Sequence, residues 1–140
     1  MRRRTLRTSR ACNARRLYGN ADVAKRIRLV GTADTKGDEL AFPRTPIAEA
    51  GTVAIVVNVG VGAPICTVDI QRGQVAAGCP ASVLEGRDRG AAVAAMGEAF
   101  QSFLAELTAF DAILGIGGGG GISIVTRATA CGRCRSACQR

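Results

Sequence analysis

Three short runs of apolar residues predict the strands of a parallel sheet. Residues 26–31 (RIRLVG) combine aliphatic and β-branched side chains and end at a glycine, which suits a first strand. Residues 51–60 (GTVAIVVNVG) are apolar without alternation, a pattern typical of a strand covered on both faces. Residues 111–117 (DAILGIG) predict a third buried strand that leads into a run of glycines.

Hydrophobic residues at helical spacing predict one long helix between the second and third strands. Within residues 86–110 these side chains recur three and four positions apart. They are Val93, Met96, Phe100, Phe103 and Leu107. We expect them to belong to the hydrophobic core, and we expect Asp88 to cap the helix at its start.

Two other stretches are less regular. A helix is expected over residues 38–50, but Pro43 and Pro46 disturb it, because an interior proline removes a hydrogen bond and clashes with the preceding turn. Residues 61–82 contain glycine and proline and show little periodicity. They predict a long loop, with short extended pieces around residues 65–70.

The order of these elements predicts an α/β fold. Strands that alternate with helices form a Rossmann-like, three-layer parallel sheet with right-handed crossovers, and here we expect that sheet to be incomplete. Ligands bind such sheets at the carboxyl ends of the strands. The polar turns after Val30 and Ile116 both fall at that edge, so we expect them to line one cleft.

The charge of the chain is concentrated in its two ends. The net charge is +8, but residues 1–26 carry nine Lys or Arg against one acid, and residues 127–140 carry four Arg and no acid. The body between them has more acidic than basic residues. A nucleic-acid-binding domain usually spreads its basic residues over one face of the fold, so this distribution does not favour nucleic acid as a partner.

Targeting signals and metal motifs are also absent from the sequence pattern. No window holds eighteen consecutive apolar residues, and no apolar segment follows the arginine-rich start, so we expect neither membrane association nor secretion but a cytoplasmic location.

Three of the six cysteines form the tail motif CGRCRSAC. Structural zinc needs four ligands and the chain has no His, so we predict no metal site there.

Residues 31–37 (GTADTKG) form the more specific of the two polar turns. Thr32 and Thr35 supply hydroxyl groups, Lys36 a movable positive charge, and Asp34 a contact for a metal ion or a ribose. Gly31 allows the chain to bend after the strand. The alternative interpretation is a solvated, well-capped turn without a ligand.

Residues 115–121 form the second turn and offer consecutive backbone N–H groups. If a helix follows, such a loop can wrap a phosphate and direct the helix dipole at it. The candidate residues are Gly117, Gly118, Gly119, Gly120 and Gly121. The glycine spacing gives little support to a dinucleotide site, and a Walker A loop is excluded because no Lys-Ser/Thr pair follows. A tight structural turn remains the alternative.

Two arginines flank the expected cap of the long helix. Arg87 and Arg89 could contact an anionic ligand or a carboxylate. The alternative is that they are surface charges or form ion pairs within the fold.

Three segments carry a resemblance to a known family. GTADTKGDEL, GRDRGAAVAAM and ILGIGGGGGISI, in this order, resemble the N-terminal domain of the UPF0261 family, which includes Tm-1-like ATP-binding proteins. The resemblance covers residues 26–126. It implies a Rossmann-like domain that binds ATP, with or without Mg²⁺, followed in the family by a TIM-barrel-like domain that this chain would lack. The nucleotide would lie between residues 31–36 and 117–121, and no reaction or catalytic residue is implied.

The chain departs from the family pattern at several positions. The family's glycine loop usually reads GLGGSGGT, so Gly119 replaces a serine and Ile122 a threonine, which removes two hydroxyl donors to phosphate. Asn58 stands where an aspartate is common. Pro43 and Pro46 interrupt a helix that is usually regular.

Residues 1–25 and 127–140 match nothing in the family. We predict that the first is an unstructured basic flank and that the second is a tail outside the fold, both artefacts of gene prediction or of a degraded gene. A missing helix after Gly121 would then expose one sheet face and favour self-association, aggregation or a partly molten state.

Three alternative functions stay open: a dinucleotide-binding oxidoreductase fragment, a basic nucleic-acid-binding protein, and a protein-interaction module. A plant member of the family acts by protein binding.

Overall fold

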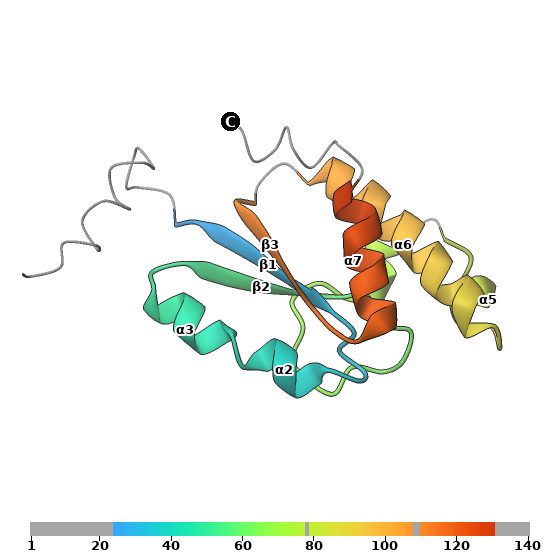
Figure 1. The fold of residues 1–140 in the computed structure, drawn as a ribbon, viewed down its shortest axis with the longest axis horizontal. Helices are drawn as coiled ribbons and strands as arrows, with labels where there is room; N and C mark the ends of the chain where they lie inside the picture. The colour runs from blue at the N-terminus through green and yellow to red at the C-terminus, as the bar shows by residue number, and fades with distance from the viewer. Residues whose placement is uncertain (1–23, 78, 108–109, 131–140) are drawn as a thin grey trace, which may run out of the picture.

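A parallel sheet forms the centre of the molecule. The computed structural model describes residues 24–77, 79–107 and 110–130. Strands β1 (Arg26–Gly31), β2 (Val53–Asn58) and β3 (Ala112–Ile116) lie in the order β2-β1-β3 and are all parallel (Figure 1). The predicted α/β fold with an open, incomplete Rossmann-like sheet is therefore confirmed.

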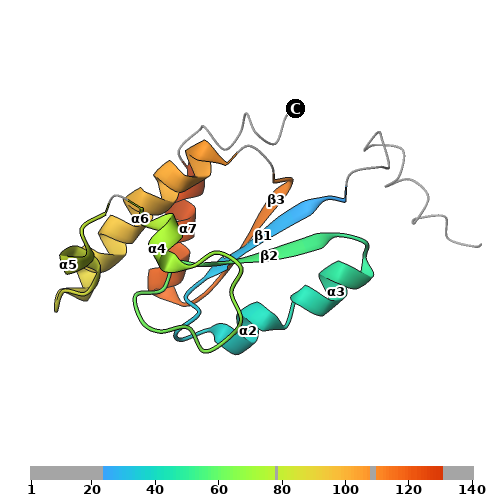
Figure 2. The ribbon, with the colours of Figure 1, turned by 180° about the vertical axis from the view of Figure 1, so that it is seen from behind.

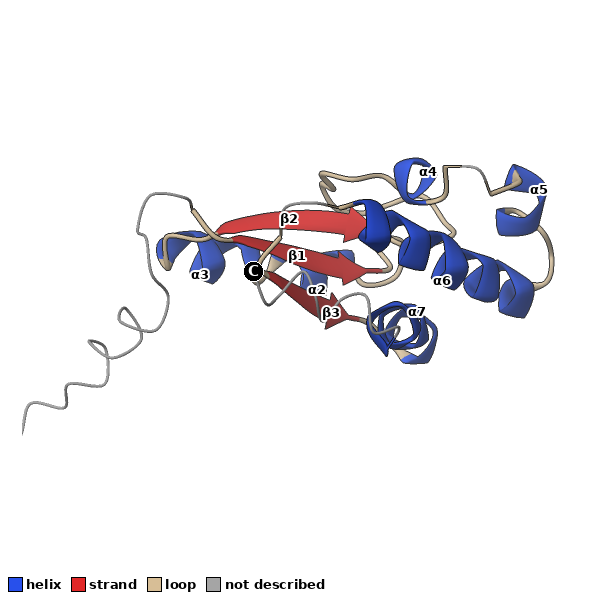
Figure 3. Ribbon diagram, turned by 90° about the horizontal axis from the view of Figure 1, so that it is seen from above, coloured by secondary structure: helices blue, strands red, loops and turns tan. Residues whose placement is uncertain are grey.

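Helices cover both faces of the sheet, as Figure 3 shows. On one face lie α2 (Gly37–Ala41) and α3 (Arg44–Glu49), and on the other lie α6 (Arg89–Glu106) and α7 (Gly119–Ala130). A hydrophobic cluster fills each interface. Beneath α6 and α7 it includes Val30, Val57, Met96, Phe100 and Ile124. Beneath α2 and α3 it includes Leu29, Ala33, Leu40 and Val56.

Helix α6 begins at the predicted cap. The Asp88 carboxylate accepts hydrogen bonds from the N–H groups of Gly90 (2.9 Å) and Ala91 (3.1 Å). Met96 and Phe100 are fully buried, as the sequence pattern predicts. Phe103 is only partly buried, and the buried face turns instead through Ala92, Gly97 and Leu104.

The prolines split the helix expected over residues 38–50. Helix α2 ends at Ala41, Phe42 is 80% exposed, and Pro43 stands at the N-cap position of α3. Pro46 is tolerated because it lies in the first turn of α3, where its missing N–H would have no intrahelical partner.

The segment between β2 and α6 has more structure than a plain loop. It contains two short helices, α4 (Arg72–Val75) and α5 (Ala81–Leu84), and α4 begins with a capping box between Gln71 and Gln74. The extended piece expected around residues 65–70 is a single bridge from Ile70 to Val57. Figure 2 shows how this segment folds back beside the end of β2.

Two expectations about the C-terminal half are wrong. The third strand is expected to be buried, but none of the five residues of β3 is, and Leu114 is 43% exposed. The helix expected to be missing after Gly121 is present as α7, which buries Ile124, Val125 and Ala128 against α6. Because α7 continues to Ala130, the predicted boundary at residue 126 falls inside a helix.

Some sequence predictions concern parts of the chain that the structure does not describe. Residues 1–23 of the predicted basic flank and the cysteine motif at residues 131–138 both lie outside the described ranges. Within those ranges, no helix is both long enough and apolar enough to cross a membrane.

Candidate functional site at the sheet switch point

The strand order places a topological switch point between β1 and β3. The chain leaves β1 toward β2 on one side, then crosses to β3 on the other side of β1 (Figure 1). In open α/β sheets, ligands bind outside the carboxyl ends of the strands at such a point. Here those ends are Gly31 and Ile116, so residues 31–37 and 117–121 both begin at the switch point.

The two turns lie against each other. A Cβ on Gly121 would be 3.5 Å from Cγ2 of Thr32, in ordinary contact with the first turn. A Cβ on Gly31 would overlap the carbonyl oxygen of Ile116, and one on Gly117 would be 3.3 Å from Cα of Gly121. Gly31 is therefore required for the close approach of β1 and β3.

The first turn is held by its own hydrogen bonds. The N–H groups of Thr35 (3.1 Å) and Lys36 (2.8 Å) donate to the carbonyl oxygen of Thr32. The two threonine hydroxyls are 2.8 Å apart and hydrogen-bond each other. These contacts fix both hydroxyl groups on the same side of the turn.

Lys36 is less free than the sequence suggests. Its ammonium group forms an ion pair with the Glu39 carboxylate at 2.7 Å. The hydrogen bond from Lys36 lowers the pKa of the Glu39 carboxyl below its ordinary value. Both side chains are exposed, so the pair is weak and an anionic ligand can compete for the lysine.

Asp34 is engaged by a third turn, which follows β2. One of its carboxylate oxygens, Oδ2, accepts a hydrogen bond of 2.9 Å from the N–H of Gly62. The other, Oδ1, is buried and has no hydrogen-bond partner among the described residues. A Cβ on Gly60 would overlap Oδ1, and one on Gly62 would lie 2.8 Å from Oδ2. The glycines at 60 and 62 therefore make room for this carboxylate.

Asn58 connects the first and third turns, and the sequence reasoning gave it no such role. Its side chain is fully buried, and its Oδ1 accepts hydrogen bonds from the N–H groups of Ala33 (3.1 Å) and Gly60 (2.8 Å). Its Nδ2 is buried without a partner in the described part of the chain. The signal in the sequence is a polar residue that ends an apolar strand and precedes Gly60.

The glycine run is mostly helical. Helix α7 begins at Gly119, so three of the five glycines form its first turn, and the N–H of Ile122 donates to the carbonyl oxygen of Gly118 at 2.9 Å. The N–H groups of a first helical turn have no intrahelical acceptor and lie at the positive end of the helix dipole. Gly118, Gly119 and Gly120 are exposed, so the backbone at this end of α7 is accessible.

The first turn of α6 lies beside this glycine run. A Cβ on Gly120 would be 3.8 Å from Cγ2 of Val93. Arg89 precedes Val93 by four residues and therefore shares its helix face. Arg87 and Arg89 are both exposed, and neither forms an ion pair with a described residue.

The described residues contain no cluster of three or more His, Cys, Asp or Glu side chains that could hold a metal ion. Residues 31–37 and 117–121 contain one carboxylate side chain, that of Asp34.

Cys66 and Cys79 are free thiols, and burial raises the pKa of Cys66.

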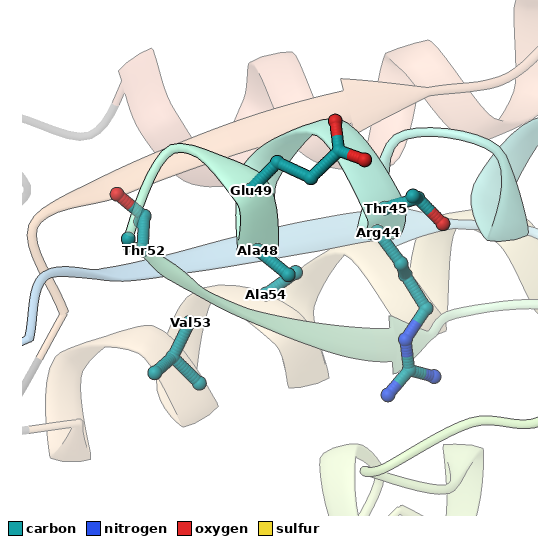
Figure 4. A pocket seen from close by; sticks show the side chains of 8 residues that line it. Arg44, Thr45, Ala48, Glu49, Thr52, Val53 and Ala54 are labelled. Carbon is teal, nitrogen blue, oxygen red and sulfur yellow. The ribbon is translucent and has the colours of Figure 1, made fainter.

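A hollow lies away from the switch point, at the amino end of β2. It has a volume of about 640 Å³ and is open to solvent, and its lining comes from α3 and the start of β2 (Figure 4). Arg44 and Glu49 are its charged residues. It shares no residue with the two turns.

Fold and site together define an α/β protein with an open parallel sheet, in which glycine- and threonine-containing turns meet at the switch point. The chain belongs to the UPF0261 family, because the model of the uncharacterised protein family UPF0261, N-terminal domain, matches residues 25–132.

Relatives from several bacteria support this assignment. A UPF0261 protein of Rhizobium meliloti (strain 1021) is 50% identical over 105 residues, which cover 73% of this chain and 26% of that protein. One from Mesorhizobium japonicum is 51% identical over 105 residues, with the same coverage. One from Clostridium tetani is 34% identical over 111 residues, covering 74% of this chain and 28% of that protein. The chain thus spans about a quarter of the length of these relatives, and no solved structure matches it.

Proposed function

We propose that this chain binds an adenine nucleotide, ATP or a close analogue, at the switch point between β1 and β3. The observation that carries the proposal is the closeness of Thr32 to Gly121, where an added Cβ would be 3.5 Å from Cγ2 of Thr32, so that the hydroxyl-bearing turn lies near the start of α7. A phosphate at that place would meet backbone N–H groups at the positive end of a helix dipole. The resemblance to Tm-1-like ATP-binding proteins supports the same class of ligand.

Residues of the two turns and of the start of α6 have separate roles in this proposal. In this proposal the N–H groups of Gly119 and Gly120 donate to phosphate oxygens, and the Thr32 hydroxyl, which hydrogen-bonds to that of Thr35, supplies a further donor near the start of α7. Lys36 supplies positive charge once it leaves Glu39. Arg89, and Arg87 before it, extend the positive charge along α6. This arrangement describes binding and assigns no reaction.

A Mg²⁺ ion that accompanies the nucleotide would need oxygen ligands. Asp34 offers Oδ1, which is buried and has no hydrogen-bond partner among the described residues. One carboxylate is enough for a magnesium ion that is held mainly by phosphate oxygens and water.

Titration with ATP, with and without Mg²⁺, tests the proposal. We expect the backbone amide signals of residues 32–36 and 117–121 to shift together in a saturable manner. The amides of residues 48–54, beside the hollow of Figure 4, are expected to stay in place. A folded sample in which neither turn responds at millimolar ATP would contradict the proposal.

The same titration separates this proposal from nucleic-acid binding by the basic ends. The experiment uses a variant that lacks residues 1–23 and 131–140. This variant keeps residues 24–130, and with them the whole of α7, which continues to Ala130. ATP binding is then expected to persist, whereas nucleic-acid binding through the arginine-rich ends would disappear.

Restoring the hydroxyl groups of the family pattern is expected to strengthen nucleotide binding. Gly119 has open space around it, and Ile122 is 39% exposed, so Gly119→Ser and Ile122→Thr fit without rearrangement. Hydrogen bonds to a charged group contribute about 1.5–3 kcal/mol each, so the double variant should lower the Kd for ATP by roughly tenfold or more. Isothermal titration calorimetry measures this change. Gly73→Ser, in the open space of α4, is the matched control and should leave the Kd unchanged.

A further inference from the structure

A second hollow lies between α6 and the segment that contains α4 and α5. Figure 3 shows α4 and α5 on one side of α6 and α7 on the other. The hollow has a volume of about 350 Å³, which is within the range of ligand pockets in proteins. It shares no residue with the two turns of the switch point or with the hollow of Figure 4. We call it the α6 groove.

Two rows of α6 side chains form one wall of the α6 groove. Residues four positions apart on a helix share a face, so each row runs along the helix. The apolar row is partly buried and consists of Ala95, Ala99 and Phe103. The polar row is exposed and consists of Glu98, Ser102 and Glu106. This wall therefore combines an apolar strip with a polar strip that has a carboxylate at each end.

The opposite wall comes from α4 and the residues that follow it. The described side chains of this wall are uncharged, and they belong to Gln74, Val75, Ala77, Cys79 and Pro80. Among the described residues, no Lys or Arg lines the α6 groove. The charge of the groove is therefore negative, although the chain as a whole carries a net charge of +8.

Both carboxylates are available to a ligand. Glu106 forms no ion pair with a described residue. Glu98 pairs with Arg127 of α7 at 4.0 Å, and both side chains are more than half exposed, so this pair is weak. A cation in the groove can compete with Arg127 for Glu98.

The spacing of the carboxylates selects the shape of the ligand. Glu98 and Glu106 are eight residues apart, so their Cα atoms are separated by about 12 Å along the axis of α6. A compact cation reaches one carboxylate, whereas a linear chain with a cationic group at each end reaches both. The hydroxyl of Ser102 lies between them in the same row and can accept a hydrogen bond from a third, central cationic group.

We propose that the α6 groove binds a linear aliphatic polyamine, a chain of methylene groups with an ammonium group at each end. The ammonium groups pair with Glu98 and Glu106, and the methylene groups lie along the apolar row. Because the net charge of the chain repels polycations, binding has to come from this local arrangement and not from the overall field of the molecule.

Isothermal titration calorimetry of the full 140-residue chain with spermidine, a linear triamine, tests the proposal in the absence of nucleotide. We expect saturable one-to-one binding that is at least tenfold tighter than that of n-butylamine, which has a single ammonium group, because the second ion pair forms within the same complex. Backbone amide signals of residues 98–106 should shift, and those of residues 32–36 and 117–121 should not. The nucleotide proposal and this one can therefore fail separately.

Ser102→Lys blocks the groove with a cation of the chain's own. The new ammonium group lies four residues from each carboxylate and can pair with either, so the Kd for spermidine should rise tenfold or more. Ala48→Lys is the matched control, since Ala48 is exposed on α3 and the substitution adds the same charge away from the groove. It should change the Kd less than about twofold.

Glu106→Gln removes one carboxylate without adding a new group. The Kd for spermidine is expected to rise roughly threefold to fivefold, which is the effect of one exposed ion pair. Glu49→Gln, at an exposed position of α3, removes the same charge elsewhere and should leave the Kd nearly unchanged.

Three results would overturn the proposal. The first is a folded sample in which the amides of residues 98–106 do not respond to spermidine. The second is an equal effect of Ser102→Lys and Ala48→Lys, because the attraction would then be one of net charge alone. The third is tighter binding of trilysine than of spermidine, because the occupant would then be a basic peptide.

Discussion

Gly31→Ala is expected to lower the free energy of unfolding by about 3 kcal/mol or more, a large part of the stability of a domain of this size. Gly31 is the last residue of β1, where it pairs with Asn58 on one side and Ile116 on the other. The added Cβ would overlap the carbonyl oxygen of Ile116 and lie 3.0 Å from Cδ2 of Leu40. Because the first neighbour is backbone, the strands themselves would have to separate.

Urea and thermal denaturation, followed by circular dichroism, measure this loss. A loss of 3 kcal/mol corresponds to a fall in Tm of at least about 12 °C. Gly73→Ala is the control, since Gly73 lies in α4 with nothing near its Cβ, and it should leave stability unchanged or raise it by about 0.5–1 kcal/mol. Equal stability of the two variants would show that β1 and β3 do not approach as closely as described.

The strands could be predicted because their signals are local. Each is a short apolar run that ends at a glycine or at a polar residue, and β1 spans the predicted residues 26–31. Once three parallel strands alternate with helices, both polar turns must begin at the same edge of the sheet. The meeting of Thr32 and Gly121 follows from topology and needs no knowledge of side-chain contacts.

The position of each strand within the sheet could not be read from its composition. Strand β3 is as apolar as β2, yet none of its five residues is buried, whereas Val56, Val57 and Asn58 of β2 are. Hydrophobic composition reports what a strand can bury, whereas burial also depends on whether a neighbour is present.

Helix α7 was missed because the sequence gives opposing local signals. Its first three residues are glycines, which disfavour a helix interior, and the arginine-rich tail predicted from residue 127 onward overlaps its last four residues. Packing outweighs these preferences: Ile124, Val125 and Ala128 are buried against α6 and the sheet. Gly115 contributes by leaving room for Val125, whose side chain would lie 2.9 Å from a Cβ at that position.

The role of the third turn, which follows β2, could not be predicted because it depends on a hydrogen bond between distant parts of the chain. Nothing near residues 60–62 marks Gly62 as a donor to Asp34, which lies 28 positions earlier in the chain. The ion pair of Lys36 with Glu39 is local by contrast, at a separation of three residues, and could have been predicted from helix geometry.

Asn58→Leu is expected to lower the free energy of unfolding by about 2–5 kcal/mol, because it removes the acceptor of two buried N–H groups. These belong to Ala33 and Gly60, and they join the first turn of the site to the third. Leucine keeps the branching of the asparagine side chain but is bulkier, so overpacking of this fully buried position adds to the loss of hydrogen bonds. Urea denaturation measures it, and the amide signals of residues 32–36 should broaden as the turn loosens.

Asn58→Asp separates the acceptor from the rest of the side chain. Aspartate keeps an oxygen for both N–H groups and removes Nδ2, a buried donor without a partner among the described residues, but it adds a second carboxylate near Asp34. Its stability should therefore lie between those of the wild type and of Asn58→Leu, and it should rise toward acidic pH, where protonation removes the repulsion. If Asn58→Leu is as stable as the wild type, these two hydrogen bonds do not hold the turns together, and the first turn is ordered by its own contacts alone.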